Sequence, residues 1–209
     1  MSKDAQGADL YQWDADICAR RGVEHLAGVD EAGAGPLAGR VYAGAVILPR
    51  GVQLPDLNDS KQVTPRRREL LFDLIREQAV SWSVAWAEPE EIDRLDILNC
   101  RMLAMQRAID ALSPAPQLVL VDGNRDHGSR CAITSPHETV VKGDAHSACI
   151  AAASILAKVS RDRYMEEMAA TYPQYAFEKH KGYPTKLHYE RLREFGPCPI
   201  HRRSFLKKL

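Results

Sequence analysis

The chain has 209 residues, which is enough for one large domain or for one domain with an appendage. Hydrophobic residues make up 45% and charged residues 27%, and 28 Lys and Arg balance 28 Asp and Glu, so net charge alone indicates no partner. Five scattered cysteines without a CxxC pair, and no apolar run of about 18 residues, argue against a disulfide framework, a zinc site and a membrane span.

The two ends of the chain differ in charge. Residues 1–22 are a polar, acidic lead-in with a short helix expected at 9–20, and they lack the apolar core of a signal peptide. We therefore expect a cytoplasmic protein with no membrane association. Residues 179–209 hold nine Lys or Arg and two Asp or Glu. Such a basic tail is typical of a segment that faces a polyanion, although a solvated surface helix has the same composition.

Strands and helices alternate in the predicted order of elements. Strands are predicted at residues 25–31, 40–48, 80–87, 117–121 and 137–141. Helices are predicted from Pro65 with Thr64 as its cap, over 89–112 in two pieces, over 146–170 and over 185–195, with an irregular loop at 171–185. This order predicts an α/β fold, a mixed five-stranded central sheet with helices on both faces. We expect one compact unit made of a lead-in (1–22), a core (23–170) and a C-terminal helical extension (171–209).

Two adjacent acids, Asp30 and Glu31, end the first predicted strand inside the glycine-rich stretch LAGVDEAGAGPLAG. Neighbouring strand residues point to opposite faces of a sheet. For both acids to serve one site, Glu31 must lie in the following turn or reach around it. A hairpin turn with two solvated acids explains this stretch about equally well when it is considered alone.

Two further acids stand at predicted strand ends. Asp122 ends the fourth strand, and Asp144 follows the fifth and opens a helix. Ligand sites of open α/β sheets gather at the carboxyl ends of strands, so these acids can meet Asp30 and Glu31. That much negative charge suits Mg²⁺ or Mn²⁺, and two such ions can activate water and stabilise the leaving oxygen of a phosphodiester. Taken singly, Asp122 fits an Asx turn and Asp144 fits a helix cap about as well.

A second set of residues suits nucleic acid. The candidates for phosphate contacts are Lys61, Lys142, Lys158, Arg161, Lys179, Lys181, Arg202 and Arg203. Backbone amides of Gly33–Gly35 can form an anion-binding nest. Tyr183, between a glycine and a proline, is a candidate for stacking on a sugar or base, or else a half-buried loop anchor. His180 and His201 are candidates for proton transfer, although a lone histidine is more often structural.

Seven segments together resemble the ordered motif set of bacterial ribonuclease HII. They are GVDEAGAGPLAG, NDSK, VDGN, VVKGD, IAAASILAKVSRD, FEKHKGYPT and HRRSF, and the similarity runs over residues 25–205. The resemblance implies a ribonuclease H-like fold with a C-terminal helical extension. It also implies a monomeric endonuclease that cuts the RNA strand of RNA/DNA hybrids. Incision at single ribonucleotides embedded in duplex DNA, leaving 3′-hydroxyl and 5′-phosphate ends, is implied as well.

The resemblance also assigns roles by motif position. Asp30, Glu31, Asp122 and Asp144 become the catalytic acids that bind Mn²⁺ or Mg²⁺. Tyr183 becomes the aromatic that packs against the sugar at the RNA–DNA junction. The loop that senses the 2′-hydroxyl through backbone groups, and the further substrate contacts, comprise Gly33, Ala34, Gly35, Ser60, Lys61, Lys142, Lys181, Arg202 and Ser204.

The chain departs from the family pattern at Ala34, because the family has Gly-Arg-Gly where this chain has Gly33-Ala34-Gly35. Alanine keeps the backbone amide but not the charge of an arginine. We therefore predict weaker substrate binding or a relaxed junction preference, with metal binding kept. A longer link at 125–138 is expected to lie in a surface loop. Two alternatives stay open at this point, a carboxylate-metal DNA nuclease of the same fold and a non-catalytic hybrid-binding protein.

Overall fold

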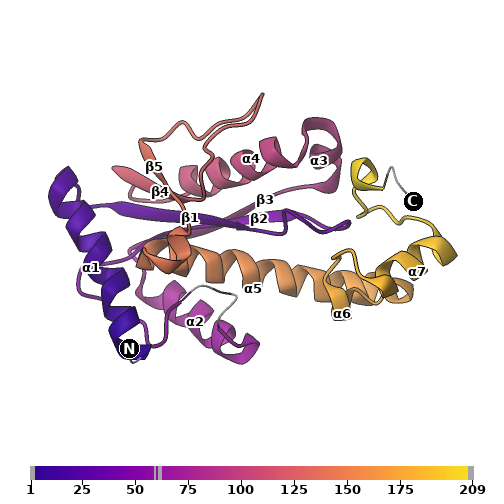
Figure 1. Cartoon of the computed structure of the whole chain (residues 1–209), viewed down its shortest axis with the longest axis horizontal. Coiled ribbons are helices and arrows are strands. Elements are labelled where there is room, and N and C mark those ends of the chain that lie inside the picture. The colour runs from indigo at the N-terminus through magenta and orange to yellow at the C-terminus, as the bar shows by residue number, and fades with distance from the viewer. Residues whose placement is uncertain (1–2, 59, 61–62, 207–209) are drawn as a thin grey trace.

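The computed structural model describes residues 3–58, 60 and 63–206, and it contains a mixed five-stranded sheet (Figure 1). The strands are β1 (Leu26–Ala32), β2 (Val41–Ile47), β3 (Ser81–Ala87), β4 (Leu118–Asp122) and β5 (His137–Val140). Their order across the sheet is β3-β2-β1-β4-β5. Neighbours β1–β2 and β2–β3 pair antiparallel, whereas β1–β4 and β4–β5 pair parallel. The predicted fold class is therefore confirmed.

Helices cover both faces of this sheet (Figure 1). The longer helices are α1 (Lys3–Arg21), α2 (Pro65–Gln78), α3 (Pro89–Leu95), α4 (Ile97–Asp110), α5 (Ala148–Thr171) and α7 (Lys186–Phe195). Short turns of helix occur at Gly143–Ala145, Pro173–Tyr175, α6 (Phe177–His180) and Arg203–Phe205. α3 and α4 lie on one face, α5 with α2 lies on the other, and α6 and α7 extend beyond one end of the sheet (Figure 1).

The alanine-rich sequence of α5 allows it to approach the sheet closely. A Cβ placed on Gly28 of β1 would lie 2.2 Å from the carbonyl carbon of Cys149. One placed on Gly44 of β2 would lie 2.4 Å from the carbonyl oxygen of Ala153. Since neither distance is possible for a real side chain, the glycines and alanines together put α5 directly on β1 and β2. The opposite face is covered by α4, whose Met105 packs in one cluster with Val29.

Local signals fixed most helix ends. Thr64 caps α2 and accepts a hydrogen bond from Arg67 N (3.4 Å). The predicted two pieces of 89–112 are α3 and α4, and Asp96, at a positive φ of 76°, separates them and caps α4. The first helix is longer than expected, since α1 covers Lys3–Arg21. The predicted irregular loop at 171–185 contains the turn Pro173–Tyr175 and α6.

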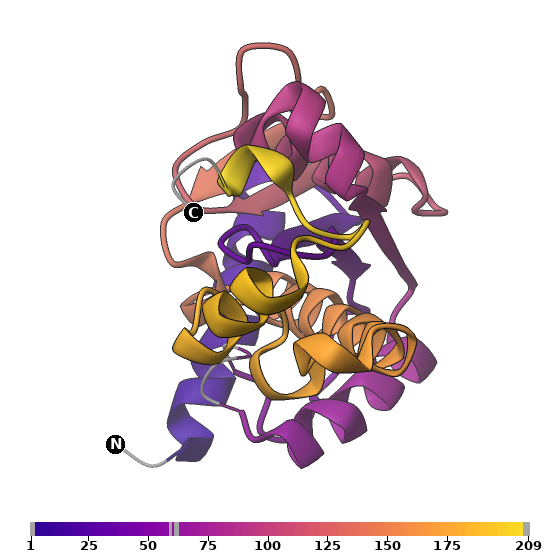
Figure 2. The same cartoon turned by 90° about the vertical axis from the view of Figure 1, so that its right-hand side faces the viewer.

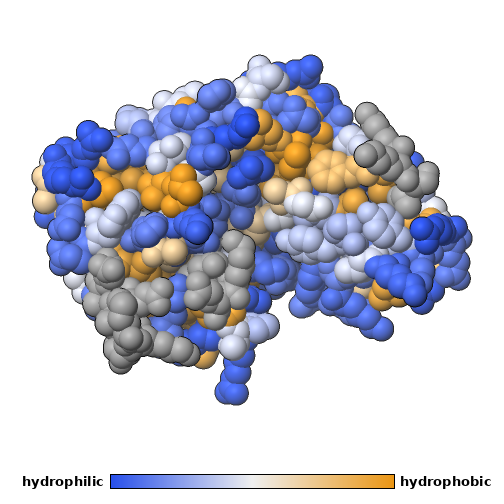
Figure 3. All heavy atoms as spheres, viewed as in Figure 1, coloured by the Kyte–Doolittle hydropathy of each residue, from blue (hydrophilic) through white to orange (hydrophobic). Residues whose placement is uncertain are grey.

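The surface is dominated by hydrophilic side chains on the face shown in Figure 3, where apolar atoms show only in separate patches. Among the described residues, no helix combines the length and the apolar character needed to cross a bilayer.

Candidate active site

The ends of β1 and β4 bring two acids together. The strands run parallel with Val29 opposite Val121, so the next residues, Asp30 and Asp122, lie side by side at the same end of the sheet. β5 ends beside Asp122, and the turn that follows places the amides of Gly143 and Asp144 on Asp122 Oδ1, at 2.7 and 3.4 Å. Three strand ends therefore meet at one place, as the sequence predicted.

This geometry decides between the readings that the sequence left open for Asp122 and Asp144. Asp122 accepts from the turn 21 and 22 residues further on, so it does not form a local Asx turn. Asp144 is 7% exposed and lies in the short helical turn Gly143–Ala145. The cap of α5 is Ser147, whose hydroxyl accepts from Ile150 N at 3.2 Å. Asp144 is therefore a buried acid beside Asp122 and not the cap of the long helix.

The acids repel one another in a buried setting. Burial raises the pKa of Asp30 well above its usual value, and the negative charges of Glu31, Asp122 and Asp144 raise it further. Burial also raises the pKa of Glu31, which the nearby Arg101 partly offsets. Keeping several carboxylates ionised in this place costs free energy, and a bound cation would offset that cost.

Glu31 does not lie in the turn, because β1 continues to Ala32. Glu31 shares a face of the strand with Val29, so its side chain points to the α4 face, opposite to that of Asp30, and Arg101 Nη2 binds Glu31 Oε1 there at 2.7 Å. The charge of Glu31 nevertheless acts on Asp30 around the end of the sheet. The other carboxylate oxygen, Oε2, is buried and has no hydrogen-bond partner among the described residues. Sequence analysis missed Arg101, because its contact with Glu31 depends on how α4 packs against β1.

A divalent cation fits the chemistry of these donors. Across the described part of the chain, no three acidic, histidine or cysteine side chains already form a ready-made cage for a metal ion. The four acids nevertheless supply only hard oxygen ligands, which Mg²⁺ and Mn²⁺ prefer. Glu31 also keeps a buried oxygen without a partner, which such an ion would satisfy.

The loop after β1 is held by Arg202 from the far end of the chain. Arg202 Nη2 donates to the carbonyl of Gly33 (2.7 Å), and Nη1 donates to those of Ala34 (3.0 Å) and Pro36 (2.8 Å). Further bonds reach the carbonyls of Gly39 (2.9 Å) and Arg40 (3.2 Å). Arg202 is 0% exposed, so the prediction that it contacts phosphate is wrong. The N–H groups of Arg202 donate to backbone carbonyls within the protein.

Arg161 is a second buried arginine below the same loop. It is 1% exposed, and its Nη2 donates to the carbonyl of Lys181 at 2.9 Å. A Cβ on Gly33 would lie 2.1 Å from Arg161 Nε, and Gly33 has a φ of +96°, so only glycine fits there. The prediction of a phosphate contact by Arg161 is also wrong, because the side chain supports the loop from inside.

Tyr183 lies beside this loop, about 150 residues away in the sequence. Leu37 N donates to the carbonyl of Gly182 (2.8 Å), and the Tyr183 ring is 3.9 Å from the position of a Cβ on Gly35. Tyr183 is 42% exposed and the Arg161 guanidinium lies 5.5 Å from its ring centre. Part of the ring therefore faces solvent beside the glycine loop, and its role in stacking on a sugar or base stays a prediction. The loop and the C-terminal segment run side by side in Figure 2, joined by the bridge between Ala38 and His201.

The remaining predicted substrate contacts have different settings. Lys142 is exposed, in a left-handed turn directly before Gly143. Lys181 Nζ binds Glu166 (2.9 Å), and Ser204 Oγ donates to Asp93 (2.6 Å). Ser60 is 6% exposed, and Lys61 lies outside the described residues. Of the other bases, Lys158 binds Asp162, whereas Lys179 and Arg203 are exposed. Their roles toward a substrate stay predictions.

The histidines proposed for proton transfer are structural. His201 Nε2 lies 3.0 Å from His188 Nε2, and its Nδ1 accepts from Cys198 N (2.9 Å). His180 Nε2 bonds the carbonyl of Tyr175 (2.9 Å). Burial lowers the pKa of His188 and His201 to about 4 and lowers that of His180 as well. The proton-transfer prediction is wrong, because all three rings are buried and bonded within the C-terminal segment.

A mixed sheet with acidic side chains near the ends of three strands, beside a glycine loop and an exposed aromatic ring, places the chain in the ribonuclease H-like fold class. The family model of Ribonuclease HII matches residues 27–208. The chain belongs to the ribonuclease HII family, and it is accordingly a hydrolytic endonuclease that acts on RNA/DNA hybrids.

Individual relatives agree with this assignment. The chain is 54% identical over 199 residues to the ribonuclease HII of Endomicrobium trichonymphae, covering 95% of this chain and 92% of that protein. It is 54% identical over 180 residues to that of Bordetella avium (strain 197N), covering 86% and 87%. The crystal structure of ribonuclease H2 from Pyrococcus horikoshii OT3 is similar, with a TM-score of 0.69 and 28% identity, covering 86% of this chain and 92% of that one.

Proposed function

We propose that Asp30, Glu31, Asp122 and Asp144 hold Mg²⁺ or Mn²⁺ and hydrolyse the RNA strand of RNA/DNA hybrids and single-ribonucleotide sites in duplex DNA. The observation that carries this proposal is the meeting of Asp30 and Asp122 at the ends of parallel strands. Both are next to Asp144, and burial, together with the repulsion among these acids, raises the pKa of Asp30.

The chain's own residues prepare this site. A bound divalent cation would supply activation of the attacking water and stabilisation of the leaving 3′ oxygen. The amides of Gly143 and Asp144 fix one oxygen of Asp122, and Arg101 fixes one oxygen of Glu31. These contacts orient the carboxylates before a ligand arrives, which lowers the cost of binding.

Peptide geometry supports a sensing role for the glycine loop. In a trans peptide the N–H points away from the C=O of the same unit. Arg202 binds the carbonyls of Gly33 and Ala34 from inside, so the amides of Ala34 and Gly35 point away from that guanidinium. Amides in this orientation can donate to a phosphate or to a 2′-hydroxyl, which is the group that distinguishes RNA from DNA. The exposed ring of Tyr183 beside Gly35 gives the sugar a surface to pack on.

A cleavage assay on three duplexes tests the proposal. The duplexes carry no ribonucleotide, one ribonucleotide, or a run of four or more, each with Mg²⁺ and with Mn²⁺. We expect metal-dependent cleavage of the two ribonucleotide-containing duplexes and none of the all-DNA duplex. Equal cleavage of the all-DNA duplex would support the DNA-nuclease alternative, and binding without cleavage would support the non-catalytic one. A monomeric state and a cytoplasmic location remain predictions from the sequence.

A further inference from the structure

The N-terminal helix α1 has no role in the proposed function so far. The family match begins at residue 27, so α1 lies outside the part of the chain that the family model covers. It crosses one end of the sheet beside the start of α5 (Figure 1). Leu10 belongs to the cluster beneath α2 and α5, and Ile17 packs with Leu26, Leu120 and Ile150.

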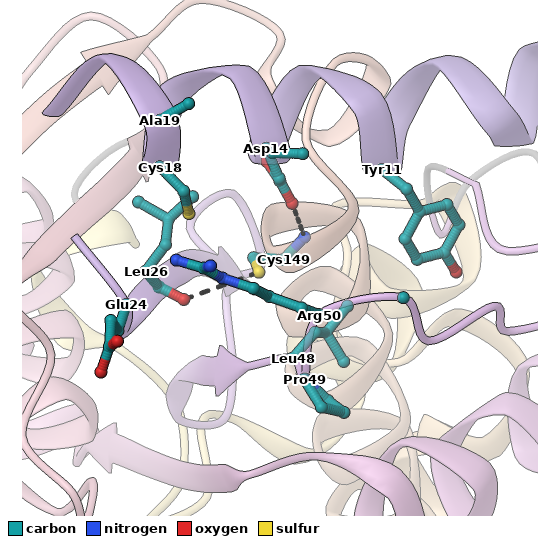
Figure 4. Close-up of a pocket in the computed structure, with 12 residues that line it drawn as sticks. Tyr11, Asp14, Cys18, Ala19, Glu24, Leu26, Leu48, Pro49, Arg50 and Cys149 are labelled. Carbon is teal, nitrogen blue, oxygen red and sulfur yellow. Dashed lines mark hydrogen bonds between the residues drawn. The ribbon is translucent and has the colours of Figure 1, made fainter. Parts of the chain in front are cut away.

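One polar contact ties α1 to the first turn of α5. Asp14 is 8% exposed, and its Oδ2 accepts from Cys149 N at 2.9 Å (Figure 4). The first amides of a helix have no partner within the helix, and its N-terminus attracts negative charge. Asp14 therefore fixes the start of α5 from a distance of 135 residues, in addition to the local cap Ser147.

Two more contacts of α1 fall on either side of Asp144. The rings of Trp13 and His146 lie 6.4 Å apart. Arg21 forms an ion pair with Glu138 on β5. The three contacts of α1 thus reach residues 138, 146 and 149, which lie before and after the turn that carries Asp144.

The turn that carries Asp144 can shift little when the elements on either side of it are held in place. Lys142 has a left-handed conformation with a φ of 55°. A Cβ on Gly143 would lie 2.4 Å from Ile150 Cδ1, so the turn packs directly against the first residues of α5. Any shift of the start of α5 is therefore transmitted to Gly143 and Asp144 beside Asp122.

The packing between this part of α1 and the sheet is incomplete. A cavity of about 230 Å³ separates α1 from the start of β1 and the end of β2 (Figure 4). Its lining includes Tyr11, Cys18, Leu26, Leu48, Arg50 and Cys149. The cavity removes apolar contacts at this place. The hydrogen bond between Asp14 and Cys149 therefore contributes more to the relative position of α1 and α5 than it would in a fully packed interface.

We propose that α1 positions Asp144: through Asp14, Trp13 and Arg21 it holds the first half of β5 and the start of α5, the two elements that flank the turn, and thereby the placement of Asp144 relative to Asp30 and Asp122. The inference rests on the proposed role of Asp144 as a metal ligand. Asp14 is accordingly a positioning residue that touches neither metal nor substrate.

The test is Mn²⁺ binding measured by titration calorimetry on the full-length protein. Asp14→Ala is expected to weaken Mn²⁺ binding by about tenfold, the low end for loss of a group that orients metal ligands. Asp14→Asn keeps an oxygen that can accept from Cys149 N, so it should restore most of the affinity. Asp16→Ala, an exposed acid two residues further along α1, is the matched control and should bind Mn²⁺ as the wild type does. The KM for a single-ribonucleotide duplex should stay unchanged in all three.

Two further variants keep the outcomes separable. Arg21→Gln removes an exposed ion pair without touching the core, and it should shift Mn²⁺ affinity in the same direction by a smaller factor. If neither Asp14→Ala nor Arg21→Gln changes Mn²⁺ affinity, while Asp144→Asn does, α1 only adds stability and the inference is overturned. If Asp144→Asn itself binds Mn²⁺ normally, the proposed role of Asp144 fails instead. If Asp14→Ala does not fold, the Mn²⁺ affinity of Arg21→Gln decides whether the inference holds.

Discussion

Arg202 Nη2 donates to the carbonyl of Gly33 at 2.7 Å, which joins the C-terminal segment to the loop that follows Asp30 and Glu31. One guanidinium serves five carbonyls of residues 33–40, so the loop has a fixed shape before any substrate binds. The C-terminal extension therefore does more than supply positive charge, because Arg202 from this extension supports the glycine loop after β1.

Replacing Arg202 by Lys should damage substrate binding more than metal binding. Lysine keeps the charge but lacks the planar fork that reaches several carbonyls at once. We expect a loss of about 3 kcal/mol in unfolding free energy, typical of a broken buried charged network, and a KM raised about tenfold for a single-ribonucleotide duplex. Mn²⁺ affinity should be unchanged. Arg203→Lys, at the exposed neighbouring position, is the control. A normal KM in Arg202→Lys would show that the loop needs no such support.

Ala34→Arg should strengthen binding of ribonucleotide-containing duplexes. Ala34 is partly exposed on the loop, and an added guanidinium there can form charge-assisted bonds worth about 1.5–3 kcal/mol. We expect a KM lowered about tenfold and a sharper preference for the RNA–DNA junction. Ala34→Gln, similar in length but uncharged, separates charge from size. Unchanged kinetics in Ala34→Arg would mean that backbone groups alone set the junction preference.

Arg101→Met should make the protein more dependent on metal for stability. Glu31 then keeps its buried position without the partner that neutralises it, which costs up to about 3 kcal/mol. A divalent cation can replace that positive charge, and ligand binding to the folded state adds stability. We expect a lower melting temperature in EDTA and a larger rise on adding Mn²⁺ than in the wild type. Combining Arg101→Met with Glu31→Gln should recover the melting temperature in EDTA. An equal Mn²⁺ response in Arg101→Met and the wild type contradicts this account.

The strand-end acids could be predicted from the sequence because strand periodicity and flanking glycines are local signals. Which arginines are buried could not be predicted in this way. Arg161 and Arg202 were expected on the surface, as most arginines are, yet carbonyls far away in the chain enclose both. The pairing of Arg101 with Glu31 likewise depends on the placement of α4 against β1, which no local pattern records. Local periodicity thus makes the strand-end acids predictable, whereas the burial of these arginines depends on long-range contacts that the sequence does not reveal.

Acid should destabilise the C-terminal segment. His188 and His201 have folded-state pKa values of about 4, lowered from 6.5 by burial. The folded state therefore binds fewer protons than the unfolded state between about pH 6.5 and 4, so stability falls as pH drops through this window. Between pH 7 and pH 5 the loss of unfolding free energy is roughly 2 kcal/mol for each ring. Denaturant titrations at pH 7 and pH 5 measure it, and NMR of the ring nitrogens should find both histidines neutral at pH 5. Protonation of either ring near pH 6.5 would contradict the prediction.

The central claim is that Asp30 and Asp122 act as carboxylates at a metal-dependent centre. The most direct measurement compares cleavage of a single-ribonucleotide duplex by the wild type, Asp30→Asn and Asp122→Asn, with melting curves recorded in EDTA. We expect both variants to lose about a thousandfold in rate, equivalent to about 4 kcal/mol of transition-state stabilisation. Asp30→Asn should melt at a higher temperature than the wild type in EDTA, because a buried repulsion is removed. Near-normal turnover by either folded variant would contradict the assignment.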